Sequence, residues 1–489
     1  MKLLKAFGIV CAILCTSLSY AQNYHALAGS PYAGVESIFH NPASSVNQVF
    51  KWDITFFSAQ GTLSNKAFLV ENASFQSLKY GSIPFKEAKL VLTDGNQERS
   101  VNGNADGSLL NFRCRLNSKS AFTFGLRGRG FLHAYSDPFI YHDSLNTLKK
   151  WANANEVIPE FNGSATHSGW IEANFNYSRV YKEDDDTRIT WGATLTVMKG
   201  LSAAEFNPRQ MTYGTALNGN NVPYYYINGG NLSYRYTQNY DLYDTNQSPR
   251  SNINTILNSS ITSYCLSFGV EYVLKDKATS TFTSWGAPEW NAKDYDWKFG
   301  AAILDLGTNY YHYGNNSAEK TIPTDLITDT LFNQYNIWHL QSLRDTVLHS
   351  YKQNSKLGGE FSIANPTRLV LSADKNLKHN FYVNGELTIS FFSNKAQSRA
   401  RTREENLLII TPRWETKGLG IYFPLQLNTD MQFWAGTAIK LGPLLVGLHD
   451  MDVFNWFHKG NHQLNGGGYI LLSIHPFGKD KEADSCPKY

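Results

Sequence analysis

Long apolar runs and cysteine are both scarce in this chain. Beyond residue 21, no segment offers the roughly 18 consecutive apolar residues that a transmembrane helix requires, so we expect no such helix. Only Cys114, Cys265 and Cys486 occur outside the first 21 residues, and an odd number at wide spacing excludes a disulfide framework. The net charge of +3 is too small to indicate a nucleic-acid partner, and we expect none.

The first 21 residues have the three parts of a secretory signal. Lys2 and Lys5 give a positive start, Ala6–Leu14 is apolar, and Ser19-Tyr20-Ala21 is a cleavage site of the small-x-small type. The apolar part is short for a membrane anchor, which is the alternative interpretation. We therefore expect residues 1–21 to be a cleavable signal peptide and the protein to be exported.

What the sequence has in abundance is alternation. In Leu110–Leu116 every even position is apolar and every odd position is polar or charged, and Ala121–Arg129 continues the pattern. Successive side chains of a strand point to opposite faces, so this pattern places one face in lipid and the other in water. Aromatic residues make up 14% of the chain, which suits the aromatic girdles of barrels. We predict an all-β fold, a transmembrane antiparallel β-barrel in the cell outer membrane.

The alternating segments divide the chain into about fourteen strands, an even number as bacterial barrels require. The predicted ranges are Trp52–Leu63, Asp106–Leu116, Phe122–Tyr135, Gly169–Tyr181, Arg188–Leu201, Ile261–Leu274, Trp297–Asn309, Thr367–Ala373, Asn380–Phe392, Glu405–Thr411, Gly418–Leu425, Met431–Leu441, Leu444–Asp450 and Gly468–Phe477. Short turns alternate with long connections, as periplasmic turns alternate with extracellular loops in such barrels. The long connections are Ser64–Ala105, Ser136–Ser168, Ser202–Ser260 and Tyr310–Pro366.

Three places depart from the regular pattern. The faces cannot be assigned through Leu304 and Asp305, which predicts a bulge there. Pro424 lacks the N–H that a ladder needs, so we expect the strand around it to be irregular. The connection 275–296 falls on the short-turn side yet is long, and the pattern does not explain it.

The segments flanking the strands are expected to differ in structure. Residues 22–51 are rich in Gly, Ala, Ser and Pro, and they are long enough to fill the barrel as a plug, with Asn41 and Pro42 shaping its turn. Residues 52–477 form the barrel with long extracellular loops, and the charged segment 478–489 forms a periplasmic tail.

The polar face of one predicted hairpin carries four arginines. A five-residue connection would place Arg113 opposite Gly125 and diagonal to Arg127. The four residues are Arg113, Arg115, Arg127 and Arg129, and Glu172, Glu271 and Glu386 lie on other polar faces. Two hypotheses stay open: a structural charge network that fills the lumen, or a contact for an anionic ligand group such as a carboxylate.

Other candidate sites are weaker. His449, His458 and His462 lie with Asp450 in or beside one predicted outer loop, but their spacing matches no metal motif and we expect no metal site. No nucleophile elbow or ordered triad occurs, so we expect neither catalysis nor a cofactor.

Two surface features bear on partners. Ser202–Ser260 is rich in tyrosine, which suits either a protein-binding surface or a loop that folds on itself. A basic stretch at a predicted outer turn matches either lipopolysaccharide head groups, beside the membrane lipid, or ordinary solvation. Its residues are Lys395, Arg399, Arg401 and Arg403.

Several short blocks resemble one family of membrane proteins. The segment Tyr32–Ala43, which ends in Asn-Pro-Ala, resembles the N-terminal segment of FadL-type outer-membrane transporters. Blocks resembling a poorly characterised branch of that superfamily, which includes PorV-type secretion components, are Leu195–Leu201, Ala364–Leu369, Thr411–Trp414 and Lys440–Leu444. The resemblance implies a fourteen-stranded barrel with an N-terminal plug and passage of a hydrophobic ligand.

These observations lead to two functional hypotheses. The first is an outer-membrane barrel that binds or admits a small hydrophobic or amphipathic ligand. The second is a barrel that transports nothing and anchors or shuttles a protein partner through its long outer loops.

Overall fold

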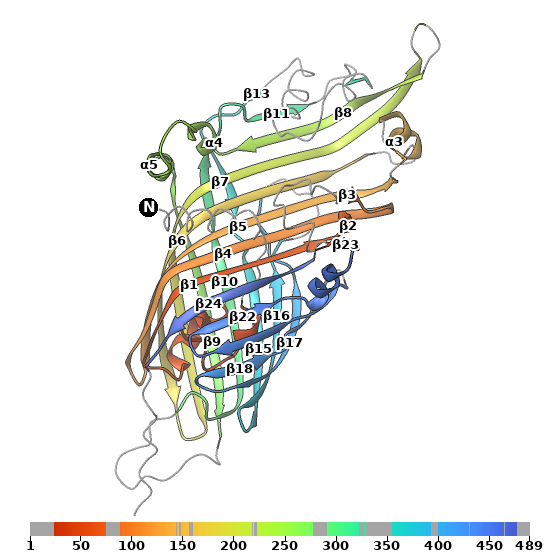
Figure 1. The fold of residues 1–489 in the computed structure, drawn as a ribbon. Helices are drawn as coiled ribbons and strands as arrows, with labels where there is room; N and C mark the ends of the chain where they lie inside the picture. Colours follow the sequence, from red (N-terminus) through yellow and green to blue (C-terminus); the bar gives the residue numbers. More distant parts are fainter. Residues whose placement is uncertain are drawn as a thin grey trace, which may run out of the picture.

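The computed structural model is a closed antiparallel β-barrel of 14 strands, which confirms the predicted fold (Figure 1). It describes residues 24–476 apart from 75–88, 143, 146–147, 156–159, 218, 220–222, 277–290, 322–326, 329–354, 393–399, 430 and 464. The predicted signal peptide and tail therefore lie outside the described residues, as does most of the long connection 275–296. Among the described residues, no helix combines the length and hydrophobicity needed to cross a bilayer.

Each predicted strand range overlaps one strand of the barrel wall. In chain order the wall consists of β1 (Trp52–Asn65), β4 (Gly95–Asn117), β5 (Ser120–Tyr141), β6 (Gly163–Glu183), β7 (Thr187–Leu217), β9 (Thr262–Lys275), β10 (Tyr295–His312), β15 (Arg368–Lys378), β16 (Phe381–Ser390), β17 (Leu407–Glu415), β18 (Leu419–Tyr422) continued by β19 (Leu425–Asn428), β20 (Phe433–Ala435) continued by β21 (Thr437–Leu441), β22 (Leu444–Leu448) and β24 (Gly466–Ile474). β1 pairs with both β4 and β24, which closes the ring.

The wall shows the expected division of faces. On β5, Thr123, Arg127 and Arg129 point inward and are buried, whereas Leu126 between them is 42% exposed on the outer surface. β9 repeats the pattern, with Glu271 buried and Phe268 and Val270 exposed. Exposed apolar side chains on the outside of a barrel face lipid, so the alternation in the sequence determines which side chains contact the membrane.

Both predicted irregularities are confirmed. The register between β9 and β10 shifts between Ile303 and Leu306, and Asp305 inside the shift has a φ of 59°. This bulge turns Asp305 toward the lumen. The strand that contains Pro424 is interrupted between β18 and β19, because the proline cannot donate to the ladder.

The outer connections are more ordered than predicted. β4 begins at Gly95 and β7 continues to Leu217, well into segments expected to be loops. The tyrosine-rich connection holds the end of β7, then β8 (Pro223–Tyr236), α4 (Asn239–Leu242) and α5 (Pro249–Ser259). Strands outside the membrane have no lipid face, so the alternation that reveals a spanning strand is lost there.

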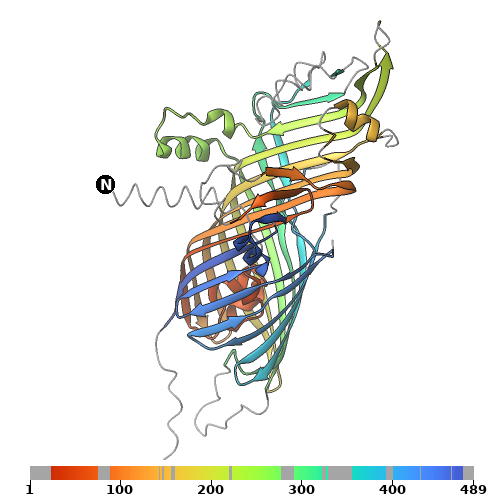
Figure 2. The ribbon, with the colours of Figure 1, turned by 45° about the vertical axis from the view of Figure 1, so that its right-hand side comes forward.

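The remaining elements also lie at the end of the barrel that carries the long connections, called the loop end; the opposite end, with the short turns, is called the turn end. They are β2 (Phe68–Ala73), β3 (Lys89–Leu92), β11 (Ala318–Thr321), β12 (Ile327–Thr328), β13 (Ser355–Lys356), β14 (Glu360–Ala364), α3 (Leu148–Ala154), η5 (Met451–Phe457) and β23 (Gly460–Gln463). After a 45° turn, the extended strands β4–β8 stand as a curved wall above the shorter strands of the C-terminal half (Figure 2).

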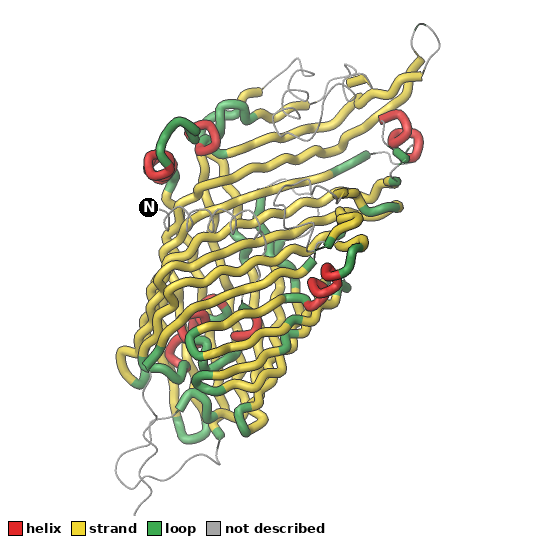
Figure 3. The backbone as a smooth tube through the Cα atoms, viewed as in Figure 1, coloured by secondary structure: helices red, strands yellow, loops and turns green. Residues whose placement is uncertain are grey.

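The N-terminal segment lies inside the barrel toward the turn end. Its three short helices, η1 (His25–Leu27), η2 (Gly34–Phe39) and η3 (Pro42–Asn47), are almost wholly buried. They are the red helical turns enclosed by yellow strands in the lower part of Figure 3. We call residues 24–50 the plug. A chain without regular structure needs polar partners inside a membrane protein, and the inward face of the wall supplies them.

Candidate functional site

The plug is seated by Asn41 and Pro42. The Asn41 side chain accepts a hydrogen bond from the Ala43 N–H at 2.9 Å and caps η3, while its amide donates to the Val270 carbonyl at 2.9 Å. Pro42 is the first residue of η3, where its fixed φ suits a helix start. A Cβ at Gly192 of β7 would lie 2.2 Å from the Pro42 oxygen, so the plug touches the wall where the wall has no side chain.

Polar side chains of the wall hold the rest of the plug. Glu271 accepts hydrogen bonds from Ser44 at 2.8 Å and from Asn47 at 2.5 Å. Ser30 donates to Glu415 at 2.7 Å, and Lys298 donates to the Gly29 carbonyl at 2.6 Å. The turn half of the lumen is therefore filled by the plug and by groups that bind it.

We call the wall groups that hold the plug its seat, and two of the four predicted arginines belong to it. Arg113 is fully buried; its Nε pairs with Asp53 at 2.6 Å, and its other nitrogens donate to the carbonyls of Ser45 at 3.1 Å and Phe50 at 2.6 Å. Arg115 donates to the Gln48 carbonyl. Both guanidinium groups hold the plug.

The other two arginines lie farther toward the loop end. Arg127 pairs with Asp106, and its guanidinium carbon lies 4.3 Å from the centre of the Phe39 ring of the plug. Arg129 forms a bidentate pair with Asp305 at 2.8 and 3.0 Å. Asp305 also binds Arg368, whose Nε lies 2.8 Å from Glu404. We name these four connected residues, Arg129, Asp305, Arg368 and Glu404, the charged layer.

The predicted pairing of this hairpin was wrong. Arg113 lies opposite Thr123, not Gly125, because the connection is a two-residue turn between Asn117 and Ser120. A further register shift separates Ser108 from Phe112, so the four arginines do not form one patch. Each reaches a carboxylate or a plug carbonyl, which accords with the charge-network hypothesis for these residues.

Apolar side chains point inward beyond the charged layer. Phe131, Trp170, Met198 and Cys265 form one buried cluster, contributed by four different strands. A second cluster consists of Ala203, Tyr311, Phe361, Ile363 and Ala400. The guanidinium carbon of Arg129 lies 5.1 Å from the Phe131 ring and 5.3 Å from the Trp170 ring, so the first cluster rests directly on the charged layer. We name the two clusters together the apolar layer.

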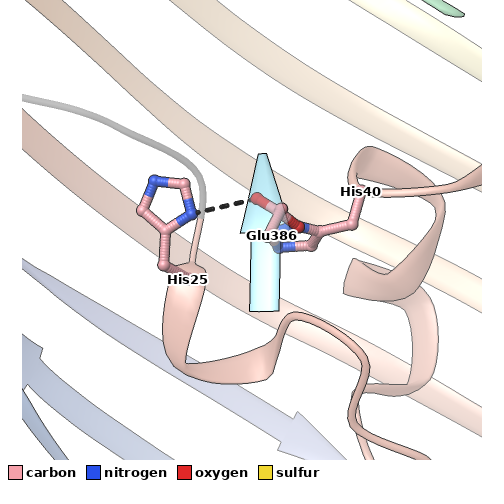
Figure 4. A group of neighbouring side chains, drawn as sticks. All are labelled: His25, His40 and Glu386. Carbon is pink, nitrogen blue, oxygen red and sulfur yellow. Dashed lines mark hydrogen bonds and ion pairs between the residues drawn. The ribbon is translucent and has the colours of Figure 1, made fainter. Parts of the chain in front are cut away.

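A third group of side chains joins the plug to the wall. His25 Nδ1 lies 3.4 Å from one oxygen of Glu386 on β16, and His40 Nδ1 lies 3.1 Å from the other. Figure 4 shows the two rings on opposite sides of the carboxylate. The ligand atoms of these three buried residues lie within 4.8 Å of one another, which is close enough to hold a metal ion.

One carboxyl of the plug has an unusual pKa. Burial raises the pKa of Glu36 to about 7, although the nearby Arg127 guanidinium acts in the opposite direction. The Asp106 carboxylate adds to the increase. Glu36 therefore changes charge near neutral pH inside the seat of the plug.

The structure refines one prediction about surface residues and corrects another. His449 begins the connection after β22 that also holds His458 and His462, as predicted, but its side chain is buried in the lumen, with its ring 6.1 Å from that of His25. Arg403 is also buried, at 7% exposure, so it cannot meet lipid head groups. Arg401 stacks on Phe392, and Lys395 and Arg399 lie outside the described residues.

Sequence reasoning missed Asp305, Arg368, Arg413 and the pair of plug histidines as members of the site. Arg413 is fully buried between Asp374 at 2.8 Å and Glu415 at 2.7 Å. Two signals were available. Arg368 and Arg413 fall in the blocks with a family resemblance, and the bulge predicted at Asp305 moves an acidic side chain inward. Nothing in the sequence around His25 and His40 indicated that they belong to the site.

Solved structures similar to this chain include a toluene transporter, a monoaromatic hydrocarbon channel and a FadL homologue. The toluene transporter TbuX of Ralstonia pickettii is 9% identical, over 91% of this chain and 94% of its own, with a TM-score of 0.39. A mutant of the monoaromatic hydrocarbon channel TodX is 10% identical, over 91% and 95%, with a TM-score of 0.41. A Pseudomonas aeruginosa FadL homologue is 10% identical, over 93% and 97%, with a TM-score of 0.38.

No curated protein matches the chain. A FadL homologue is among the similar structures, as the resemblance of residues 32–43 predicts. One family model matches residues 42–449, which include most of the barrel and the end of the plug. The chain therefore belongs to the family of unknown function DUF5723.

Proposed function

We propose that this outer-membrane barrel binds and admits a small hydrophobic or amphipathic molecule from its loop end. The observation that carries the proposal is the apolar layer. The lumen of a membrane barrel is normally polar, so inward-facing aromatic and aliphatic side chains need a reason. Phe131, Trp170 and Met198 are packed against one another and would line an apolar site once they part around a ligand, and Tyr311 and Phe361 extend this lining toward β14.

The charged layer supports an amphipathic ligand in particular. Arg129 and Arg368 lie directly beneath the apolar side chains and share Asp305 as a partner. A ligand carboxylate that took one of these contacts would displace a protein carboxylate, and the polar end of a neutral amphipathic ligand avoids that cost because it adds no charge beside Glu404 and Glu172. The plug closes the path below this point.

Binding to the purified barrel in detergent tests the proposal. We expect toluene or decanoate to bind saturably and to quench the fluorescence of Trp170. Met198→Asn places an amide in the apolar layer and should lower the affinity about tenfold or more, whereas Met198→Leu should leave it nearly unchanged. Absence of saturable binding, or equal binding by both variants, would contradict the proposal.

A second function is favoured by the length of the outer strands. β7 has 31 residues, about three times what a strand needs to cross the membrane. The curved wall of β4–β8 offers a surface to a protein partner, which corresponds to the alternative hypothesis of an anchoring barrel. Removing residues 210–229 should then abolish cross-linking of the partner in cells and leave ligand binding intact. The second function would be contradicted if neither the full chain nor the shortened chain cross-linked a partner and the shortened chain also lost ligand binding.

A further inference from the structure

His25, His40 and Glu386 come from three distant parts of the chain and meet inside the barrel. His25 begins η1, His40 directly follows η2 as its C-cap, and Glu386 lies on the inward face of β16. Their relative exposures are 3%, 6% and 2%, so water does not compete freely for them. The two Nδ1 atoms lie 3.4 and 3.1 Å from the two oxygens of the single carboxylate.

Several histidine ring nitrogens around this carboxylate have no hydrogen-bond partner among the described residues. Among the residues that the structure describes, neither ring nitrogen of His25 has a hydrogen-bond partner of good geometry, and Nε2 of His40 has none. His449 is buried beside His25, and neither of its ring nitrogens has a hydrogen-bond partner among the described residues. Buried polar atoms are nearly always satisfied, so these five nitrogens are available to an additional partner such as an ion.

The donor set identifies the chemical class of the ligand. Two imidazoles and one carboxylate are ligands that zinc and similar divalent transition metals take, whereas calcium and magnesium prefer oxygen donors alone. The ligand atoms lie within 4.8 Å of one another, so small side-chain movements would bring all three to about 2.0–2.2 Å from one zinc ion. His449 places a fourth imidazole next to these three.

We propose that His25, His40 and Glu386 bind one divalent transition-metal ion, of which Zn²⁺ is the representative, and that this ion locks the plug to the wall. The ion would join both ends of the N-terminal half of the plug to β16. Since it binds the seated plug and not the released one, an ion present at one hundred times its Kd would reduce plug release about a hundredfold. The site stands whether or not a hydrophobic molecule passes through the barrel.

The test uses the full mature chain without a polyhistidine tag, refolded in detergent and stripped of metal. Zn²⁺ alone is the ligand, and the bound ion is counted after gel filtration. All forms carry His458→Gln and His462→Gln, which remove two histidines near the outer surface. We compare this background with His40→Gln and Glu386→Gln. His133→Gln is the matched control, because His133 is a buried lumen histidine bonded to Asn102.

We expect one tightly bound Zn²⁺ in the background and in His133→Gln, and at least a hundredfold weaker binding in His40→Gln and Glu386→Gln. Co²⁺ in place of Zn²⁺ should give a visible absorption band that the same two variants lose. Zinc should also slow hydrogen exchange of residues 24–50 in the background and leave it unchanged in Glu386→Gln. Heat-modifiable migration establishes that each variant is folded.

Three outcomes would overturn the proposal. The first is no stoichiometric zinc in the folded background. The second is equal zinc affinity in the background and in a folded Glu386→Gln form. The third is zinc that binds without changing exchange in the plug, which would remove the lock. None of these results depends on toluene or decanoate, so failure of the metal site and failure of the proposed transport are separate findings.

Discussion

In the turn half of the lumen, the wall meets the plug through buried polar contacts such as Arg113–Phe50 and Glu271–Asn47. In the loop half, beyond Asp305, the same strands carry Phe131, Trp170 and Met198 packed against one another. The wall residues of both sets lie on the inward faces of β4, β5, β6, β7 and β9, yet the first are charged and the second are apolar.

This difference separates a gate from a binding surface. When the plug leaves its seat, water can replace its hydrogen bonds and ion pairs at small net cost, whereas the apolar contacts of Leu27 with Leu445 and Leu471 oppose release. Apolar side chains gain no such replacement, so they favour another apolar group as a partner. The charged layer marks the boundary between the two, with Arg129 paired to Asp305 and in contact with Trp170 on the apolar side.

The largest expected effect comes from removing the gate. Deletion of residues Tyr24 to Ser44 should leave a folded barrel whose permeability to small solutes is raised, while the fluorescence of Trp170 in the loop half stays as before. Liposome swelling measures the permeability. Unchanged permeability in a correctly inserted deletion form would show that residues 24–44 do not occlude the lumen.

Breaking the central ion pair of the seat should have the next largest effect. Arg113→Met leaves the buried Asp53 carboxylate without its ion-pair partner and two plug carbonyls without their donor, and we expect a loss of about 3–5 kcal/mol in the free energy of unfolding. Urea unfolding followed by heat-modifiable migration measures it.

The control for this variant is Arg179→Met, on the exposed face of β6, which should cost less than about 0.5 kcal/mol. Asp53→Asn combined with Arg113→Met should lose less than Arg113→Met alone, since no buried charge remains unpaired. Equal losses for Arg113→Met and Arg179→Met would mean that the ion pair does not stabilise the seat.

The seat should also respond to pH through Glu36. Its pKa in the folded protein, about 7, lies above the ordinary value of 4.5, so the neutral form is favoured when the plug is seated. The stabilisation is fully present below pH 4.5 and is lost as the pH rises through 7, to a total on the order of 3 kcal/mol.

Hydrogen exchange of residues 24–50 between pH 5 and pH 8, corrected for the intrinsic rate, measures this loss. Glu36→Gln should abolish the pH dependence and leave exchange in the apolar layer unaffected. A pH dependence that persists in Glu36→Gln would assign it to another group.

The smallest effect concerns the fit between plug and wall. Gly192→Ala introduces a Cβ that would lie 2.2 Å from the Pro42 oxygen and 2.7 Å from the Ala43 nitrogen, so η3 must shift, at a cost of about 1–3 kcal/mol. Faster hydrogen exchange in residues 42–47 reports the shift.

Gly128→Ala on β5 is the matched control, because a Cβ there meets nothing within 4 Å. If both alanine variants behave alike, the close approach of Pro42 to the wall does not hold the plug in place.

The sequence by itself determined which residues face lipid and which face the lumen. Alternation is a local property, because successive side chains on any strand point to opposite faces whatever the strand pairs with. The predicted strands, the bulge at Asp305 and the break at Pro424 all followed from local rules of this kind. The same rules failed for β4 and β7 outside the membrane, where no lipid imposes alternation.

Only the tertiary structure decided which inward-facing groups meet. The turn between Asn117 and Ser120 set the register of Arg113, and closure of the ring brought Arg129 to Asp305, 176 positions away. His40 meets Glu386 across 346 positions, and only because the plug enters the lumen. Contacts across a barrel depend on its strand number, stagger and filling, which are properties of the closed wall and not of any single strand.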